Sequence, residues 1–316
     1  MIDTQYKCAF HFIFFKAYPS LNLRVEVHKD QHKALALLPG LRFDDISHTG
    51  QPDLHRLMNL IGRVEHAALY ENINSFIDYQ NLVRKGIGSY AKAVVMEIRR
   101  HFYETTTPKS PIQVSLKLTG MMDTMYTVRS SATFGGRQRA SIMVKSCNSL
   151  VHRESGLTEQ IPDWWRLKFL RLLPEMPDNY RPIVPPDSVG KTFSHHVLVP
   201  LRDTDTSGRT RHPSYTRYFI DNISIAANRN FYPNLANLLH DFYVMRISVV
   251  HFSPSVWGDS LVVETFQDPA DDLKIHCFIS KDGAIKWYGC LEYYEAMFEP
   301  EVETPAYMLN FPTSER

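Results

Sequence analysis

Apolar residues recur at helical spacing in two separate stretches of the chain, and strand-like runs follow each stretch. The first stretch places apolar residues three or four positions apart, at Leu54, Leu57, Met58, Ile61, Val64 and Ala68. The second does the same after Pro213, at Tyr215, Phe219, Ile223 and Ala226. This spacing puts the apolar side chains on one face of a helix, so we predict two amphipathic helices that pack on a core.

Four runs rich in β-branched and aromatic residues follow each predicted helix. After the first helix they span residues 90–102, 112–118, 126–134 and 139–150, and Gly135-Gly136 provides a hairpin turn. After the second they span residues 243–252, 260–266, 274–280 and 284–294, and Asp282-Gly283 provides the turn. The order of loop, helix and four strands therefore occurs twice, which predicts two copies of one α+β unit.

This repeat divides the chain into five parts. The first unit covers residues 41–162, the second covers residues 192–297, and residues 298–316 form a tail. Residues 1–40 have no readable function, although the alternation in Leu21–Val27 is typical of a strand. Residues 163–191 form a connector with five prolines between residues 174 and 186, which exclude a helix or a central strand there. We expect this connector to cross between the units in an extended form.

A loop with two carboxylates precedes the second helix. Asp203 and Asp205 come before Gly208, and His212 stands directly before Pro213, a residue favoured at the first helical position. His212 is therefore expected to cap the helix. A helix N-terminus carries free N–H groups and about half a positive charge. A carboxylate beside it is suited to attack a carbonyl, or to activate water, while the helix end polarises that carbonyl.

The pattern Asp205-x-x-Gly208-x-x-x-His212-Pro213-x-Tyr215 resembles the hotdog-fold acyl-CoA thioesterases, especially the 4-hydroxybenzoyl-CoA thioesterase type. The resemblance implies that Asp205 is the catalytic carboxylate and that the N–H of His212 binds the thioester oxygen. For the whole chain it implies an α+β double hotdog, in which two long helices are each wrapped by an antiparallel sheet and the sheets pair edge to edge. Many relatives carry His-Val-Asn-Asn where this chain has Arg209-Thr210-Arg211-His212, and this leaves the substrate class open.

The other polar residues of the loop have supporting roles in this interpretation. Asp203 is expected to orient the loop or to pair with Arg202. Arg209 and Arg211 are either solvated charges or contacts to the phosphates of coenzyme A. Tyr215 is either part of the core or a substrate contact.

The first unit lacks the catalytic carboxylate. When Gly50 is aligned with Gly208, Ser47 falls opposite Asp205, and serine is a poor acid–base group without a partner. We therefore expect one active site per chain. Glu65, a polar residue on the first helix near the expected interface between the units, is not assigned a catalytic role.

Composition narrows the function further. The length of 316 residues suits two units of about 150, and a net charge of +1 provides no footprint for nucleic acid or an anionic membrane. No apolar run approaches the length of about 18 residues that a membrane span requires.

The cysteines form no Cys-x-x-Cys pair and are expected to be reduced thiols; they are Cys8, Cys147, Cys277 and Cys290. No metal site is predicted, and the Gly-x-Ser-x-Gly and His-Glu-x-x-His motifs are absent.

These observations predict a cytoplasmic enzyme that hydrolyses an acyl-CoA thioester, with a fatty acyl group favoured, to a free acid and coenzyme A. No cofactor is expected, because coenzyme A arrives as part of the substrate. Several points stay open: whether Asp205 acts as nucleophile or general base, whether the acyl group is carried by coenzyme A or a carrier protein, and whether the chain forms a homodimer. The alternative is a catalytically inactive hotdog protein that binds an acyl or aromatic ligand or serves as an interaction scaffold.

Overall fold

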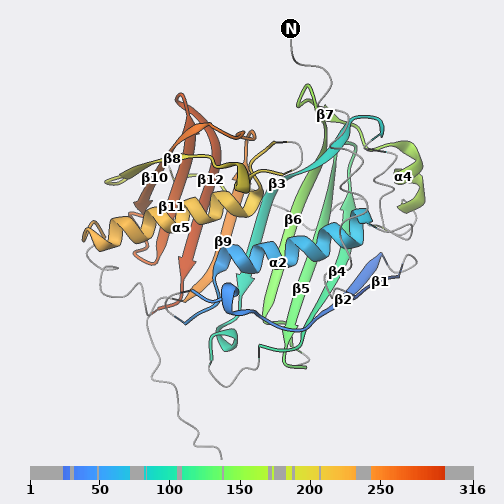
Figure 1. Cartoon of the computed structure of the whole chain (residues 1–316), viewed down its shortest axis with the longest axis horizontal. Coiled ribbons are helices and arrows are strands. Elements are labelled where there is room, and N and C mark those ends of the chain that lie inside the picture. The colour runs from blue at the N-terminus through green and yellow to red at the C-terminus, as the bar shows by residue number, and fades with distance from the viewer. Residues whose placement is uncertain are drawn as a thin grey trace, which may run out of the picture.

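In the computed structural model, two long helices pack on one face of a single antiparallel sheet (Figure 1). The structure describes residues 24–28, 32–47, 50–71, 82, 84–104, 109–136, 139–169, 173, 183–186, 189–205, 208–232 and 243–295. Cys8, most of the connector prolines and the tail at 298–316 lie outside the described residues.

The described strands form one continuous sheet. In spatial order they are β1 (Arg24–His28), β2 (Lys33–Leu38), β4 (Ile112–Met121), β5 (Met125–Phe134), β6 (Ile142–His152), β3 (Ile87–Ile98), β9 (Val244–His251), β12 (Ala284–Tyr293), β11 (Lys274–Lys281), β10 (Ser260–Gln267) and β8 (Phe193–Leu198). A short strand, β7 (Thr158–Glu159), pairs with β6. The two units meet where β3 and β9 run antiparallel, with Ala93 opposite Val250 and Glu97 opposite Arg246.

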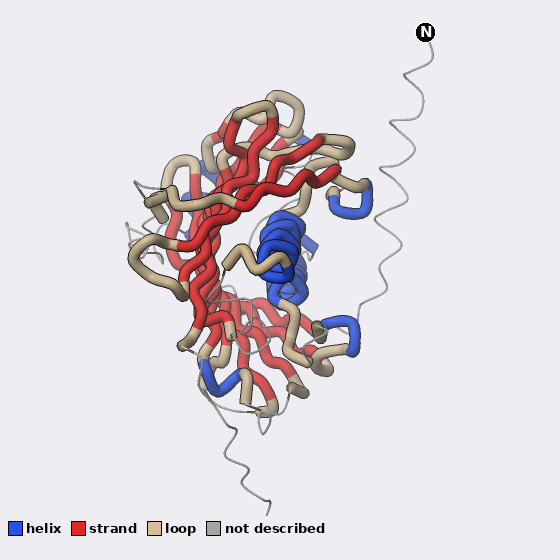
Figure 2. Tube along the Cα trace, turned by 90° about the vertical axis from the view of Figure 1, so that its left-hand side faces the viewer, coloured by secondary structure: helices blue, strands red, loops and turns tan. Residues whose placement is uncertain are grey.

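The sheet curves around the two helices, which lie in its hollow (Figure 2). Helix α2 (Leu54–His66) continues into a short π-helical turn at Ala67–Glu71, and α5 (His212–Asn228) belongs to the second unit. Both predicted apolar stripes are buried. The stripes and both halves of the sheet share one core, in which Ile61 of α2 and Phe219 of α5 belong to the same cluster as Val94 of β3 and Val249 of β9. The helix predictions are therefore confirmed.

Both predicted hairpin turns are present. Gly135 and Gly136 have φ angles of 63° and 72°, and Asp282 and Gly283 have φ angles of 50° and 77°. Asp282 and Gly283 join β11 directly to β12, and two successive residues with positive φ match the right-handed twist of these strands. Gly135 and Gly136 instead begin a longer connection from β5 to β6, which starts at Ile142.

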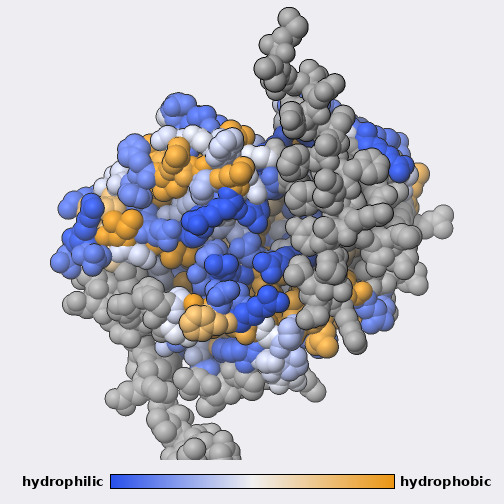
Figure 3. All heavy atoms as spheres, viewed as in Figure 1, coloured by the Kyte–Doolittle hydropathy of each residue, from blue (hydrophilic) through white to orange (hydrophobic). Residues whose placement is uncertain are grey.

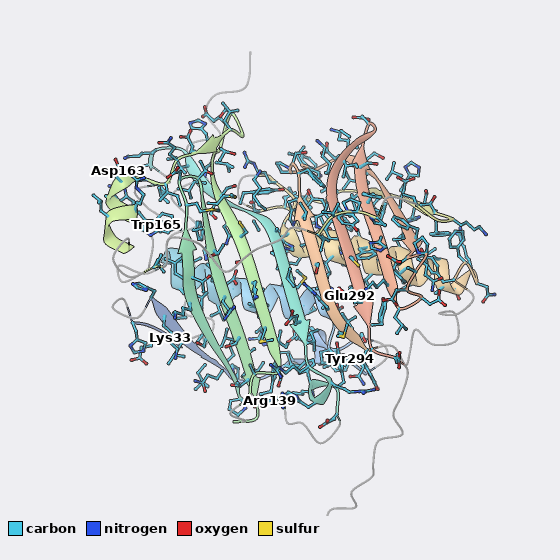
Figure 4. All side chains as sticks on the ribbon, turned by 180° about the vertical axis from the view of Figure 1, so that it is seen from behind. Lys33, Arg139, Asp163, Trp165, Glu292 and Tyr294 are labelled. Atoms are coloured by element: carbon cyan, nitrogen blue, oxygen red, sulfur yellow. The ribbon has the colours of Figure 1, made fainter. Side chains whose placement is uncertain are left out.

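The first unit begins earlier in the chain than the predicted boundary at residue 41. Strand β2 pairs with β4 along its whole length and β1 pairs with β2, so residues 24–38 extend the sheet. The start of the expected connector also belongs to this unit. Helix α4 (Asp163–Phe169) buries Trp165 completely, with its ring centroid 5.1 Å from that of Tyr126 (Figure 4). The described cysteines, Cys147, Cys277 and Cys290, are buried free thiols.

Candidate active site

A tight loop between the end of β8 and α5 holds Asp205 at the surface. The Asp205 N–H donates to the Arg209 carbonyl at 2.8 Å, and the Gly208 N–H donates to the Asp205 carbonyl at 3.0 Å. The Arg209 N–H also donates to the Asp205 carboxylate at 3.2 Å. Gly208 has a φ of 75°, a conformation that glycine adopts without steric cost. The sequence of this loop therefore places the carboxylate of Asp205 in an exposed position.

Asp203 lies beneath the loop and ties it to α5. Its buried carboxylate pairs with the Arg217 guanidinium and accepts a hydrogen bond from the Tyr218 hydroxyl at 2.6 Å. Its carbonyl accepts the Arg211 N–H at 2.8 Å. Asp203 thus pairs with Arg217 and not with Arg202, and its contacts agree with the other expected role, that of orienting the loop. Burial, followed by the hydrogen bond to Asp203, raises the pKa of Tyr218, so its hydroxyl remains a donor.

The N-terminus of α5 is open. The residue before the helix is Arg211, whose side chain makes no capping hydrogen bond and instead donates to the Arg202 carbonyl. His212 is the first helical residue, so the expectation that His212 caps the helix is wrong. The His212 N–H has no acceptor among the described residues, and Pro213 has no N–H. A backbone donor is therefore available at the helix end that follows the Asp205 loop.

Two histidines with buried ring nitrogens lie at this helix end. The rings of His212 and His251 are 4.5 Å apart between centroids, and neither has a hydrogen-bond partner among the described residues. Burial lowers the pKa of His212 to about 4. Burial, followed by repulsion from His212, holds the pKa of His251 well below its usual value. Both imidazoles are therefore neutral at pH 7.

The first unit also contributes to this region. Tyr90 of β3 lies with its ring centroid 5.7 Å from that of His251, and its hydroxyl has no partner among the described residues. Burial raises the pKa of Tyr90, with smaller effects from Tyr215, Arg209 and Asp205. Arg209 donates to the Arg153 carbonyl at 2.6 Å, across the boundary between the units. Sequence reasoning missed this contact between the units, and its one sequence signal is a histidine, His251, at the end of a largely apolar strand.

Tyr215 supports the loop from inside the core. Its side chain is fully buried, and its hydroxyl accepts the Ser255 N–H at 2.8 Å and bonds to the Ser255 hydroxyl at 2.6 Å. The Ser255 hydroxyl in turn bonds to the Thr210 hydroxyl at 2.9 Å. The geometry thus places Tyr215 in the core, behind the residues that shape the loop.

The corresponding loop of the first unit has the same backbone pattern. The Ser47 N–H donates to the Gln51 carbonyl at 2.7 Å, and the Gly50 N–H donates to the Ser47 carbonyl at 3.0 Å. Ser47 therefore occupies the position of Asp205. The helix ends differ, because the Asp53 carboxylate accepts the His55 N–H at 3.1 Å and so caps α2.

Two further features bear on ligands. Among the described residues, no group of three or more histidine, cysteine, aspartate or glutamate side chains could hold a metal ion. A cavity of about 460 Å³ lies at the end of β9 opposite His251, and its lining includes Met245, Glu292 and Tyr294, the last two of which are labelled in Figure 4.

No helix in the described part of the chain has the length and apolar character needed to cross a membrane.

The architecture is similar to that of several thioesterases of known structure. A candidate oleoyl thioesterase from Lactobacillus plantarum matches 86% of this chain and 100% of its own, with a TM-score of 0.67 and 9% identity. A 12:0-ACP thioesterase from Umbellularia californica matches 83% of this chain and 97% of its own, with a TM-score of 0.64 and 8% identity. An acyl-ACP thioesterase from Bacteroides thetaiotaomicron matches 84% of this chain and 100% of its own, with a TM-score of 0.61 and 11% identity.

Sequence comparison adds nothing to this. Neither a protein-family profile nor a curated protein sequence matches the chain. The chain has the hotdog fold found in these thioesterases, and the likeness is one of structure rather than of sequence.

Proposed function

We propose that this protein hydrolyses an acyl thioester at the N-terminus of α5. The observation that carries the proposal is the combination of an exposed Asp205 carboxylate with a His212 N–H that has no acceptor among the described residues. A single hydrogen-bonded loop joins the two groups. Thioester hydrolysis requires a carboxylate to attack or to activate water, and a donor for the oxygen that becomes negatively charged.

In this mechanism the His212 N–H binds the carbonyl oxygen of the thioester. One such donor, aimed at the developing negative charge, typically contributes ~3–4 kcal/mol to the transition state. Asp205 then either attacks the carbonyl carbon, forming an anhydride that water cleaves, or removes a proton from an attacking water. Both routes break the carbon–sulfur bond and release the acid and the thiol.

We further propose that the two units are two hotdog repeats with one working site between them. The units share a continuous sheet through β3 and β9, and Tyr90 and Arg153 of the first unit lie at the edge of the second unit's loop. The first unit carries Ser47 at the position of Asp205 and a capped α2. The first unit would then complete the site of the second and hold no site of its own.

The proposed substrate is an acyl-CoA with a fatty acyl group. Arg209 and Arg211 flank the loop, and each uses only part of its guanidinium to bind a backbone carbonyl. Their remaining N–H groups suit the phosphates of coenzyme A, because guanidinium binds phosphate through two parallel hydrogen bonds. The related structures named above are described as oleoyl, acyl-ACP and 12:0-ACP thioesterases, which supports a fatty acyl group. Two of these names give the acyl carrier protein as the carrier, so the test below includes both carriers.

The test is hydrolysis of a series of saturated acyl-CoA esters and one aromatic ester, with detection of the released thiol, and the same acyl groups on a carrier protein. Wild-type protein is expected to release thiol from at least one ester. Asp205→Asn keeps the size of the side chain and removes its charge, so hydrolysis should fall by orders of magnitude. Ser47→Ala is the matched control in the first unit and should retain turnover. If no ester is hydrolysed but the acyl groups bind, the protein is a ligand-binding hotdog and the proposal is wrong.

A further inference from the structure

The exposed apolar side chains of the second unit gather at one end of the sheet. In the described residues from 192 to 295, the large apolar side chains that are exposed have exposed fractions between 45% and 68%; they are Leu198, Leu201, Phe252, Val256, Trp257 and Ile285. They come from the end of β8, the loop after it, the β9–β10 turn and the start of β12. This is the end of the sheet that carries the Asp205 loop.

Backbone hydrogen bonds hold these segments together. The Gly258 N–H donates to the Val199 carbonyl at 3.0 Å, which joins the Trp257 turn to the end of β8. The Phe252 N–H donates to the Lys286 carbonyl at 2.9 Å, which joins the same turn to β12. Figure 3 shows exposed apolar side chains at the upper left of the molecule, among strongly hydrophilic ones. The six side chains, named here the apolar rim, thus come from segments that backbone hydrogen bonds join at one end of the sheet.

Basic residues accompany the apolar rim. Arg202, Arg209 and Arg211 lie in the adjoining loop, and none of them pairs with a carboxylate among the described residues. Asp203 and Asp259, two acids of the same region, are already neutralised by Arg217 and Lys281. Although the net charge of +1 provides no footprint for an anionic membrane over the whole chain, this surface combines apolar groups with unpaired positive charge, and Asp205 is the acid that opposes that charge within the loop.

We propose that the apolar rim docks the protein on an anionic lipid surface. Large exposed apolar groups beside one another mark an interaction site, because water contact with them is unfavourable. Tryptophan and leucine beside arginine suit the boundary between headgroups and acyl chains, where the ring and the aliphatic groups enter the lipid and a guanidinium group binds phosphate. Arg202, which has no part in the proposed coenzyme A contacts, is the arginine assigned to the lipid phosphates. The inference goes beyond the proposed hydrolysis, since lipid binding requires no turnover.

The same surface would set the orientation of the protein on the lipid. Arg209 pairs in an isolated β-bridge with Val256 of the apolar rim, so the Asp205 loop adjoins the docked surface. A docked molecule would hold this loop against the lipid rather than toward bulk water. An acyl ester that partitions into the lipid would therefore meet the loop directly.

The test is co-sedimentation of the full chain with vesicles of phosphatidylcholine alone and of phosphatidylcholine mixed with phosphatidylglycerol. We expect binding to the mixed vesicles to be at least tenfold tighter than to the neutral ones, and to weaken as salt is raised. Brominated lipid should quench the fluorescence of Trp257, because Trp165 and Trp287 are fully buried and the partly buried Trp164 lies on α4 of the first unit. A Trp257→Phe protein provides the background signal.

Two double variants identify the surface. Leu201→Ser with Trp257→Ser should weaken vesicle binding at least tenfold, whereas Leu37→Ser with Leu167→Ser changes similarly exposed leucines elsewhere and should bind as wild type does. Circular dichroism verifies that both variants fold. Arg202→Gln should reduce the preference for anionic vesicles. Absence of binding to the mixed vesicles, equal binding to both vesicle types, or equal loss in the two double variants would each overturn the proposal. Because the assay measures binding alone, its outcome is independent of whether the protein hydrolyses thioesters.

Discussion

Asp53 and Arg211 occupy the same position before the two central helices, and only Asp53 caps its helix. Each backbone N–H donates at 2.8 Å to an aspartate carbonyl eight residues earlier, that of Asp45 for Asp53 and that of Asp203 for Arg211. The Asp53 carboxylate then accepts the His55 N–H, while the Arg211 side chain turns to the Arg202 carbonyl. Helix α2 therefore has a capped N-terminus and α5 an uncapped one. Only the uncapped N-terminus follows a loop that carries an exposed acid.

Removing the cap of α2 and introducing a cap on α5, in two separate variants, should separate the effects on stability from those on activity. Asp53→Ala removes the cap of α2 and should lower the free energy of unfolding by about 1 kcal/mol. Arg211→Asp introduces a cap on α5 and should retain or raise stability, while it places a negative charge at the donor proposed to bind the thioester oxygen. Hydrolysis should fall at least tenfold in Arg211→Asp and stay unchanged in Asp53→Ala. Urea unfolding and thiol release measure the two quantities, and full activity in Arg211→Asp would argue against the open helix end as the oxyanion site.

Asp203 should matter for stability far more than Asp205 does. Asp203→Ala leaves Arg217 without its partner and Tyr218 without its acceptor. Removing one partner of a buried pair typically costs ~3–5 kcal/mol, and because Arg217 is partly exposed we expect the loss to be about 2–3 kcal/mol. Asp205→Ala changes an exposed side chain and should alter the free energy of unfolding by less than about 0.5 kcal/mol. Urea unfolding of both variants checks this, and equal losses would show that the Asp205 loop has a structural role.

Glu65 should make the protein less stable as pH rises through neutrality. Its carboxyl accepts the Ser130 hydroxyl at 2.9 Å, and burial raises its pKa to about 7, with the hydrogen bond opposing the shift. The folded state therefore keeps a proton that the unfolded state has lost above pH 4.5. The stability that this group contributes is full below pH 4.5 and is lost as pH rises from 4.5 through about 7. Over this window the free energy of unfolding falls by roughly 3 kcal/mol.

Glu65→Gln tests this interpretation because it retains an acceptor for Ser130 and cannot ionise. At pH 5 the variant and the wild type should unfold at similar temperatures, and at pH 8 the variant should be the more stable. Thermal unfolding at both pH values measures the difference. The opposite result would be a wild-type unfolding temperature that rises, relative to that of Glu65→Gln, between pH 5 and 8. It would show that the carboxyl is hydrated and ionised in the folded state.

The repeat and the loop were predictable because local rules determine them. Helical spacing identifies α2 and α5, glycine and aspartate at turn positions identify the hairpins at Gly135 and Asp282, and the alignment of Ser47 with Asp205 agrees with the matching hydrogen bonds of the two loops. Strands β8 and β2 were harder to predict. Strand β8 has two adjacent histidines, and every residue of β2 after Lys33 is apolar, so neither shows the alternation of polar and apolar residues that marks a strand.

The contact between Tyr90, His212 and His251 was beyond sequence reasoning. The antiparallel junction of β3 with β9 brings Tyr90 to His251, and His212 reaches the same ring from α5. Nothing local predicts which edge strands of two units will pair, because the pairing depends on complementary surfaces that exist only after each unit folds. This part of the site is therefore known only from the structure, whereas the acid and the start of α5 could be predicted from the sequence.

Tyr90 should influence hydrolysis if the first unit completes the site. Tyr90→Phe removes a buried hydroxyl that has no partner among the described residues, so stability should be unchanged or slightly higher. If that hydroxyl contacts the substrate, kcat/KM should fall about 10–100-fold. Tyr103→Phe is the matched control, because its hydroxyl donates to the Val244 carbonyl at 2.8 Å. That variant should lose ~1 kcal/mol of stability and keep its activity, and identical kinetics in both variants would exclude Tyr90 from the site.

His212 should contribute to hydrolysis through its backbone and not through its ring. His212→Ala keeps the N–H, so turnover should remain within about tenfold of wild type, while the lost packing against His251 lowers stability by about 2 kcal/mol. The wild-type ring is neutral in the fold because burial lowers its pKa to about 4. The unfolded state takes up a proton near pH 6.5, so this group destabilises the protein as pH falls from 6.5 toward 4, and the variant should lose less stability over that range.

The rival assignment, in which the His212 ring is the general base, predicts a different pair of results. Turnover would collapse in His212→Ala, and the wild-type rate would titrate with an apparent pKa near 6–7, the usual range of an active imidazole. A buried ring with a pKa of about 4 would instead leave the rate flat through that range. Collapse together with a titration near neutrality would transfer the base role from Asp205 to His212, whereas a flat profile with retained turnover would leave Asp205 as the acid–base or nucleophilic group.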